Sequence, residues 1–124
     1  MQEIFFLLEK ELDQGRPAVL ATIVSHKGST PRATGTRMAV RSDGSGRGTI
    51  GGGKVEAEVL VGAASVFREK RNKFLTFKLQ GQEAAEADML CGGELEVFLE
   101  YFSEKDPRRR GFLRDVSAHL RKGE

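Results

Sequence analysis

The spacing of apolar side chains alternates along the chain between that of helices and that of strands. Residues 2–14 carry apolar side chains at helical spacing, and Gly15 and Pro17 follow as a stop signal, so a first helix is predicted there. Residues 18–26, AVLATIVSH, are mostly apolar, with several β-branched side chains. Such a run is typical of a strand that is buried on both faces.

A loop and a hairpin are predicted next. Residues 27–36 combine Gly, Ser, Thr and Pro, which is typical of a loop. Residues 36–41 and 47–50 predict two short strands. The Asp-Gly pair within residues 42–46 favours a hairpin turn between these strands.

The apolar spacing becomes helical again over residues 55–71, and residues 73–80 then predict a strand. Residues 81–89 are polar and rich in alanine, so a loop and a short helix both stay open for them. Residues 94–102 alternate acidic and apolar side chains, which predicts a strand with one solvent-exposed face.

Residues 107–121 predict a last helix, because Asp106 and Pro107 form a suitable N-cap and first-turn pair. Its buried face is expected to comprise Phe112, Leu113, Val116 and Leu120. The order of helix, strand, hairpin, helix, two strands and helix predicts a mixed α/β (α+β) fold. We expect one sheet with a β-hairpin, about three helices packed on it, and a single domain over residues 1–124.

The composition is that of an ordinary globular protein. The 124 residues carry a formal net charge of +2, and charged residues interrupt the apolar runs, so no membrane-spanning segment is expected. The N-terminus lacks the features of a secretory signal, and the single cysteine fits a reducing compartment, so we expect a cytoplasmic protein. The arginines at positions 108–110 are interpreted as a solvated helix start, because no nucleic-acid-binding motif accompanies them.

Three stretches that contain glycine stand at the ends of predicted elements and are the candidates for chemistry. In the first, Ser29 and Thr30 offer hydroxyl groups, Pro31 stiffens the loop, and Arg32 offers a planar set of donors. These groups suit an anionic oxygen group such as a phosphate. A solvated loop between two strands is the alternative interpretation of the same residues.

The second stretch, TIGGGKVEAE, places three consecutive glycines at positions 51–53, between a predicted strand and a helix. Glycine removes the Cβ atoms that would keep a ligand away from the backbone, and a helix N-terminus attracts anions. A P-loop is excluded, because Val55 follows Lys54 where a hydroxyl group would be needed. A simple turn is the alternative, with Glu56 placed favourably toward the helix dipole.

The third stretch, MLCGG, sets Cys91 beside two glycines. An accessible thiol and a small buried side chain are both open for this cysteine. The two histidines, His26 and His119, form no metal-ligand motif, and no pair of carboxylates stands out. No complete catalytic constellation is therefore predicted.

Taken in order, these motifs resemble the XdhC/CoxI family. The match comprises Gly-Ser-x-Pro-Arg at residues 28–32, Asp-Gly at 43–44, Gly-x-Ile-Gly-Gly-Gly at 48–53 and Cys-Gly-Gly at 91–93. It extends over roughly residues 18–100. Any one of these motifs is weak evidence, but the ordered set is specific.

The family comprises accessory proteins of molybdenum hydroxylases such as xanthine dehydrogenase and carbon monoxide dehydrogenase. The resemblance implies a protein that is not an enzyme and that binds the molybdenum cofactor, molybdopterin, as cargo. It also implies two partners, a cysteine desulfurase for sulfuration and the apo-hydroxylase for insertion. The cofactor-binding set that it implies is Gly28, Ser29, Thr30, Arg32, Gly51, Gly52, Gly53, Lys54, Glu56, Cys91, Gly92 and Gly93, with Cys91 as a candidate ligand to molybdenum.

Two features depart from the family pattern. Lys54 stands where many members have a cysteine, so this chain cannot supply a thiol there. Members commonly carry a second, C-terminal Rossmann-like domain, which residues 1–124 do not include, and an exposed sheet edge favours a homodimer. Two other functions stay open: a domain that docks the hydroxylase or desulfurase without cofactor, and a small thiol-dependent enzyme that uses Cys91.

Overall fold

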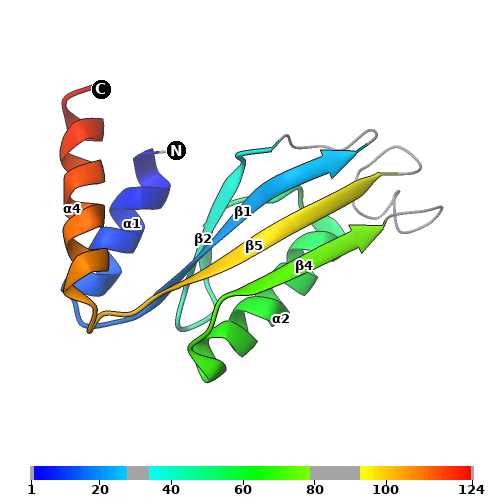
Figure 1. Cartoon of the computed structure of the whole chain (residues 1–124), viewed down its shortest axis with the longest axis horizontal. Helices are drawn as coiled ribbons and strands as arrows, with labels where there is room; N and C mark the ends of the chain where they lie inside the picture. The colour runs from blue at the N-terminus through cyan, green and yellow to red at the C-terminus, as the bar shows by residue number, and fades with distance from the viewer. Residues whose placement is uncertain (1, 28–33, 79–92, 124) are drawn as a thin grey trace.

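A five-stranded antiparallel sheet forms the centre of the protein (Figure 1). The computed structural model describes residues 2–27, 34–78 and 93–123. The strands lie in the order β3-β2-β1-β5-β4, so the two long strands β1 and β5 pair at the centre. The strand bounds are β1 Ala18–Lys27, β2 Arg37–Arg41, β3 Gly46–Gly48, β4 Lys73–Lys78 and β5 Glu94–Phe102.

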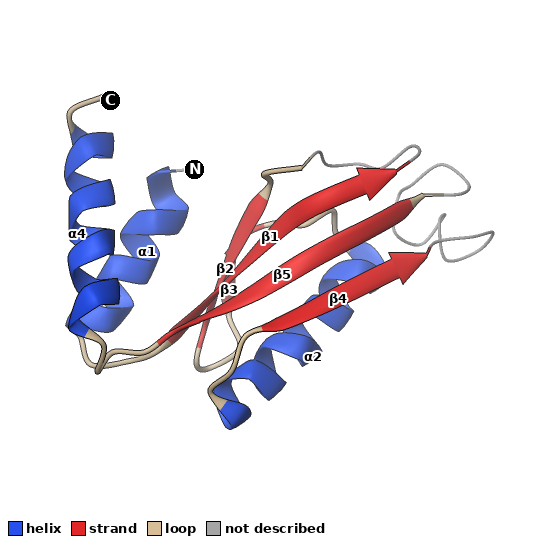
Figure 2. Ribbon diagram, in the orientation of Figure 1, coloured by secondary structure: helices blue, strands red, loops and turns tan. Residues whose placement is uncertain are grey.

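Three helices occur in the described residues: α1 (Gln2–Asp13), α2 (Gly53–Glu69) and α4 (Pro107–Arg121). Helix α2 packs along one face of the sheet, α1 lies against the opposite face, and α4 packs on α1 (Figure 2). The predicted mixed α/β fold, with one sheet, a β-hairpin and three helices, is confirmed. None of the helices in the described ranges is long and apolar enough to cross a membrane.

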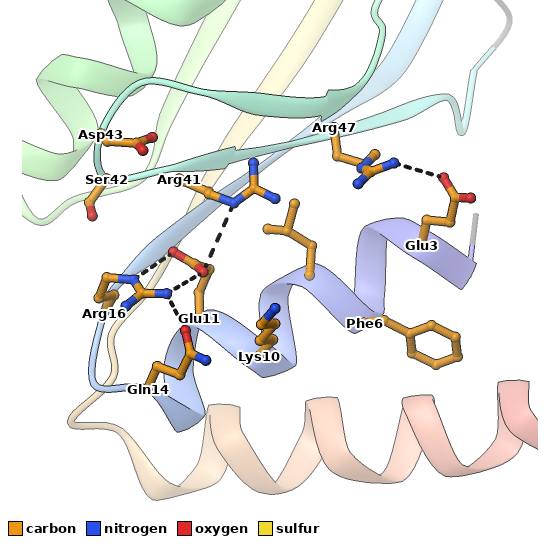
Figure 3. Close-up of a pocket in the computed structure, with 11 residues that line it drawn as sticks. Glu3, Phe6, Lys10, Glu11, Gln14, Arg16, Arg41, Ser42, Asp43 and Arg47 are labelled. Carbon is orange, nitrogen blue, oxygen red and sulfur yellow. Dashed lines mark hydrogen bonds and ion pairs between the residues drawn. The ribbon is translucent and has the colours of Figure 1, made fainter.

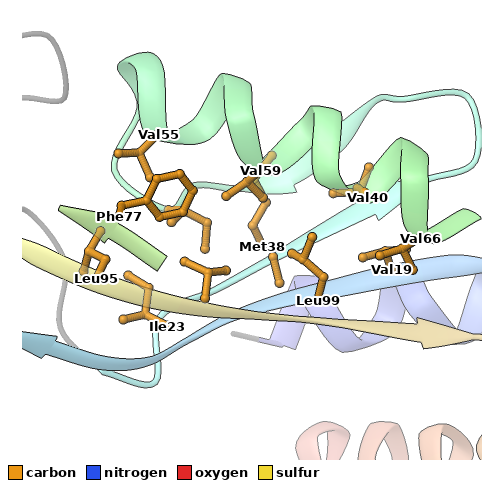
Figure 4. Packing of buried hydrophobic residues seen from close by; sticks show 14 residues of the cluster. Val19, Ile23, Met38, Val40, Val55, Val59, Val66, Phe77, Leu95 and Leu99 are labelled. Atoms are coloured by element: carbon orange, nitrogen blue, oxygen red, sulfur yellow. The ribbon is translucent and has the colours of Figure 1, made fainter. Parts of the chain in front are cut away.

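The larger hydrophobic core lies between α2 and the sheet (Figure 4). Alternate residues of β1 and β5 point toward α2, as the twofold period of a strand requires. These fully buried side chains are Val19, Ala21, Ile23, Leu95, Val97 and Leu99. On α2, Val55, Val59, Ala63 and Val66 recur at helical spacing and cover them.

A smaller core lies on the opposite face of the sheet, under α1. Leu8 and Leu12 of α1 pack there with Leu20 of β1 and Phe102 of β5. This layer covers the end of the sheet near α1 and α4. Farther along the same face the cover ends, and Phe74 of β4 is 65% exposed.

Two predicted element bounds were wrong. The returning strand of the hairpin comprises Gly46–Gly48 instead of residues 47–50, because Gly48 has a φ of +88° and the chain then turns Ile50 into the core. Helix α2 ends at Glu69 instead of residue 71, because Lys70 adopts a left-handed conformation with a φ of 56°. The other predicted elements agree with the structure to within two residues at each end wherever it describes them; residues 79–89 lie outside the described ranges.

The last helix begins as predicted, since the side chain of Asp106 accepts hydrogen bonds from the backbone N–H groups of Arg108 and Arg109. Its predicted apolar face is only partly buried. Leu113 is fully buried, but Phe112 is 52% exposed, because α4 packs on α1 and only a narrow strip of α4 is covered. The arginines are also less solvated than expected: Arg109 pairs with Glu100, and Arg110 pairs with Asp13 at 3.3 Å.

Candidate functional site

The first and third glycine-containing stretches adjoin strands that meet at one end of the sheet. Strand β1 ends at Lys27, β4 ends at Lys78, and β5 begins at Glu94, which the register pairs with both lysines (Figure 1). The flanks of the two stretches therefore lie side by side. Gly93 is described and buried; Gly28, Ser29, Thr30, Arg32, Cys91 and Gly92 lie outside the described residues.

The second stretch, residues 51–53, lies at the same end of the sheet, because it leads into the first turn of α2. In this turn, Val55 belongs to the same buried cluster as Phe77 of β4 and Leu95 of β5, both close to that end (Figure 4). Sheet pairing and core packing thus bring the three stretches, or their described flanks, to one end of the molecule.

The three glycines form a turn that other residues cannot readily adopt. Gly51, Gly52 and Gly53 have φ values of +134°, +77° and +60°, in the half of conformational space that favours glycine. A Cβ atom on Gly52 would meet no other atom within 4 Å. The backbone at Gly52 therefore borders open space, and it caps α2 without help from a side chain.

Glu56 holds this turn in place. Its carboxylate accepts hydrogen bonds from the Thr49 hydroxyl and from the Ile50 N–H at 3.3 Å, and the Gly51 N–H donates to Thr49 Oγ1 at 3.1 Å. Sequence reasoning placed Glu56 in the first helical turn but missed these bonds. The contacts give Glu56 a structural role at the site.

Hydrogen bonds of His26 and Ile23 connect the chain before the first stretch with the chain after it. The Nδ1 atom of His26 lies 2.8 Å from Thr34 Oγ1, and the N–H of Gly35 donates to the carbonyl of Ile23 at 2.8 Å. The residues that precede and follow the undescribed part of this stretch are therefore tied together.

The described groups at this end of the sheet suit an anionic ligand. The open glycine turn precedes a helix N-terminus, where backbone N–H groups and the helix dipole favour negative charge, and Lys54 is exposed in the first helical turn. Within residues 2–27, 34–78 and 93–123, no group of three His, Cys, Asp or Glu side chains could hold a metal ion.

A separate hollow of about 540 Å³ lies between α1 and the β2–β3 hairpin (Figure 3). At its base, the Glu11 side chain is only 4% exposed and accepts hydrogen bonds from Arg16 at 3.0 and 2.9 Å. The hydrogen bonds from Arg16 lower the pKa of Glu11, although burial opposes this shift. Sequence reasoning missed this ion pair between Arg16 and Glu11. The signal that could have revealed it was an acidic residue within the apolar face of α1.

Replacing Arg16 with alanine is expected to lower the free energy of unfolding by about 1–2 kcal/mol at pH 7. Of its ion pairs with the described residues, the buried Glu11 carboxylate would keep the one with Arg41, at 4.0 Å. Because the pKa of Glu11 is lowered in the folded state, this stabilisation is present above pH 4.5, the ordinary pKa, and is lost as the pH falls through the lower folded-state value.

Urea unfolding of Arg16→Ala and wild type between pH 7 and pH 3.5 measures both effects. The exposed Arg114 on α4 provides a control, since Arg114→Ala should leave the stability within about 0.5 kcal/mol of wild type. Equal stability of wild type and Arg16→Ala at pH 7 would contradict a stabilising role of the ion pair between Arg16 and Glu11.

Comparison with known proteins identifies a matching family model and several relatives of this chain. A model described as the XdhC and CoxI family matches residues 11–78. The chain is 38% identical over 98 residues to the uncharacterized protein YqeB of Escherichia coli (strain K12). It is 30% identical over 96 residues to the molybdenum cofactor insertion chaperone PaoD of the same strain. Each alignment covers 77% of this chain, but only 18% of YqeB and 30% of PaoD.

The fold is also similar to a solved structure, the crystal structure of a xanthine dehydrogenase from Bacillus halodurans. The TM-score is 0.73 and the sequence identity is 29%, and the match covers 96% of this chain and 35% of that chain. The chain thus spans about a third or less of the length of each of these three proteins.

Proposed function

The chain belongs to the XdhC and CoxI family, and we propose that it acts as an accessory protein of a molybdenum hydroxylase. In this role it binds the molybdenum cofactor as cargo, assists its sulfuration by a cysteine desulfurase, and helps to insert it into the apo-hydroxylase. The name of PaoD, a molybdenum cofactor insertion chaperone, supports this function, as does the name of the solved relative, a xanthine dehydrogenase. The protein carries the cofactor and catalyses no reaction of its own.

The observation that carries the proposal is the convergence of the glycine turn and the flanks of the other two stretches at one end of the sheet. Molybdopterin is a pterin with a dithiolene and a terminal phosphate, and it is anionic when it holds an oxo-molybdenum group. A surface for it needs close backbone approach and positive charge. The open backbone at Gly52 and the exposed Lys54 meet these needs.

Each candidate residue then has a role in holding the cargo. Ser29, Thr30 and Arg32 bind its anionic end, with Gly28 allowing the chain to turn beside them. Gly51, Gly52 and Gly53 form the floor that the ligand approaches, and Glu56 keeps that floor in shape. Lys54 neutralises charge, and Cys91, next to Gly92 and Gly93 in the sequence, binds near the molybdenum or the dithiolene.

Replacing Arg32 with alanine is expected to weaken cofactor binding by at least about tenfold, the effect of one lost charge-assisted pair. The measurement is an anaerobic titration of the protein with molybdenum cofactor released from a purified molybdoenzyme. Arg114→Ala is the matched control, because Arg114 is exposed on α4 and outside the candidate site.

Two outcomes of this titration would contradict the proposal. If wild type binds no cofactor yet still captures the apo-hydroxylase or the desulfurase, the protein is a docking domain. If Arg32→Ala and Arg114→Ala bind equally well, the cofactor does not use the first stretch. A thiol-dependent enzyme would instead show rapid alkylation of Cys91 at neutral pH, which the carrier role does not require.

A further inference from the structure

A second pocket lies between the sheet and the two helices α1 and α4, on the face of the sheet that α1 covers. Its volume is about 580 Å³, within the range of roughly 300–1,000 Å³ that is common for small-molecule sites. The lining comes from β1, β2, β5, α1 and the first turns of α4. Among the residues that the structure describes, none from the glycine-containing stretches lines the pocket.

Aromatic side chains form the walls of this pocket. Phe102 of β5 is buried, Phe5 of α1 is half-buried, and Phe112 of α4 is 52% exposed at the rim. Phe112 is among the few large apolar side chains that the described part of the chain leaves exposed. Such walls suit a flat ring, which stacks on aromatic side chains.

The charge of the pocket is positive, with three arginines against two carboxylates. Both carboxylates already have donors: Glu100 pairs with Arg109, and Asp106 Oδ1 accepts from the N–H of Arg108 at 2.9 Å and of Arg109 at 3.4 Å. The guanidinium of Arg109 also stacks on Phe102, 4.6 Å from the ring centroid. Each carboxylate thus already accepts hydrogen bonds from residues of the pocket.

Two other arginines reach the pocket beside the aromatic walls. The guanidinium of Arg37 lies over the Phe5 ring, 5.8 Å from its centroid, and donates to the carbonyl of Gly35 at 3.0 Å. The side chain of Arg108 is exposed and makes no ion pair with the residues that the structure describes. A guanidinium that is exposed in this way, as that of Arg108 is, can bind phosphate in a two-pronged geometry.

We propose that this pocket binds a planar aromatic ring that carries a phosphate group, the chemistry of a nucleoside monophosphate. The ring stacks on Phe112 and Phe5, and the phosphate binds Arg108 with support from Arg37. This site goes beyond the proposed cofactor-carrier function and does not depend on it, because no described residue that lines the pocket belongs to the candidate cofactor-binding set.

Titration of the ¹⁵N-labelled chain with adenosine 5′-monophosphate, monitored by amide chemical shifts, tests the site. We expect saturable shifts at the start of α4 and on the adjoining parts of β1 and β5. Adenosine alone and inorganic phosphate alone should each bind at least about tenfold more weakly than the nucleotide. The same spectra report whether each variant is folded.

Two variants separate the parts of the ligand. Arg108→Gln should weaken binding of the nucleotide about tenfold but leave binding of adenosine unchanged. Phe112→Ala should weaken binding of both about tenfold. Each has a matched control outside the pocket, Arg114→Gln on the same helix and Phe74→Ala, whose ring is also exposed.

The proposal is overturned if the nucleotide gives no saturable shifts, or if inorganic phosphate binds as tightly as the nucleotide. It is also overturned if Arg108→Gln behaves like Arg114→Gln. Arg32→Ala should bind the nucleotide as wild type does, so failure of either site leaves the other standing.

Discussion

Replacing Leu99 with alanine is expected to lower the free energy of unfolding by about 2–5 kcal/mol, because the change leaves a cavity in the larger core. Leu99 is fully buried on β5, where the sheet packs against α2. Urea unfolding at pH 7 measures the loss. Val61, which is 72% exposed on α2, provides the control, and Val61→Ala should change stability by less than about 0.5 kcal/mol.

Gly62 on α2 makes this prediction sharper. A Cβ atom at Gly62 would lie 2.9 Å from Leu99 Cδ1 and 3.0 Å from Leu75 Cδ1. Gly62→Ala should therefore overpack the wild-type core and lower the free energy of unfolding by about 1 kcal/mol or more. In the Leu99→Ala background one of these two contacts is gone. There, the higher helix propensity of alanine should make Gly62→Ala neutral or stabilising by up to about 1 kcal/mol. Additive effects of the two changes would contradict close packing of α2 on β5.

The secondary structure could be predicted from the sequence because it depends on short-range spacing. The alternation in Glu94–Phe102, for example, matches a strand that buries Leu95, Val97 and Leu99 against α2. The errors arose where tertiary packing decides. Phe112 has the spacing of a buried residue but stands at the rim of a pocket, because α4 packs on α1.

The candidate site could be predicted only as separate stretches. Their common location depends on strand order, since β5 pairs with both β1 and β4 and so brings Glu94 beside Lys27 and Lys78. Local patterns do not specify such pairing between distant segments. The ordered motifs suggested the family, and the family suggested one site. The bonds from Glu56 to Thr49 and Ile50 depend on the turn itself and needed the structure.

Replacing Gly52 with alanine is expected to lower the free energy of unfolding by about 1–3 kcal/mol through backbone strain alone. Gly52 has φ and ψ of 77° and −171°, a conformation that is almost exclusive to glycine. Steric crowding is not a factor, because a Cβ atom there would meet nothing within 4 Å. Urea unfolding measures the loss.

Gly111→Ala is the matched control for this substitution. Gly111 lies within α4, its φ is not positive, and its Cβ would also meet nothing within 4 Å, so this change should stabilise the protein by about 0.4–1 kcal/mol. The two glycines thus differ in backbone conformation and not in the room available for a Cβ atom. If both alanine variants changed stability in the same direction, the inference that residues other than glycine are strained at position 52 would be contradicted.

The same pair of variants connects the turn to the proposed function. A methyl group at position 52 points into the open space where the cofactor is proposed to approach, so Gly52→Ala should also weaken cofactor binding, whereas Gly111→Ala should not. Measured at a temperature where both variants are fully folded, a loss of binding reports on the surface and not on stability. Unchanged binding by Gly52→Ala would mean that the glycines serve the turn alone, and the cofactor would then have to be held by the other two stretches.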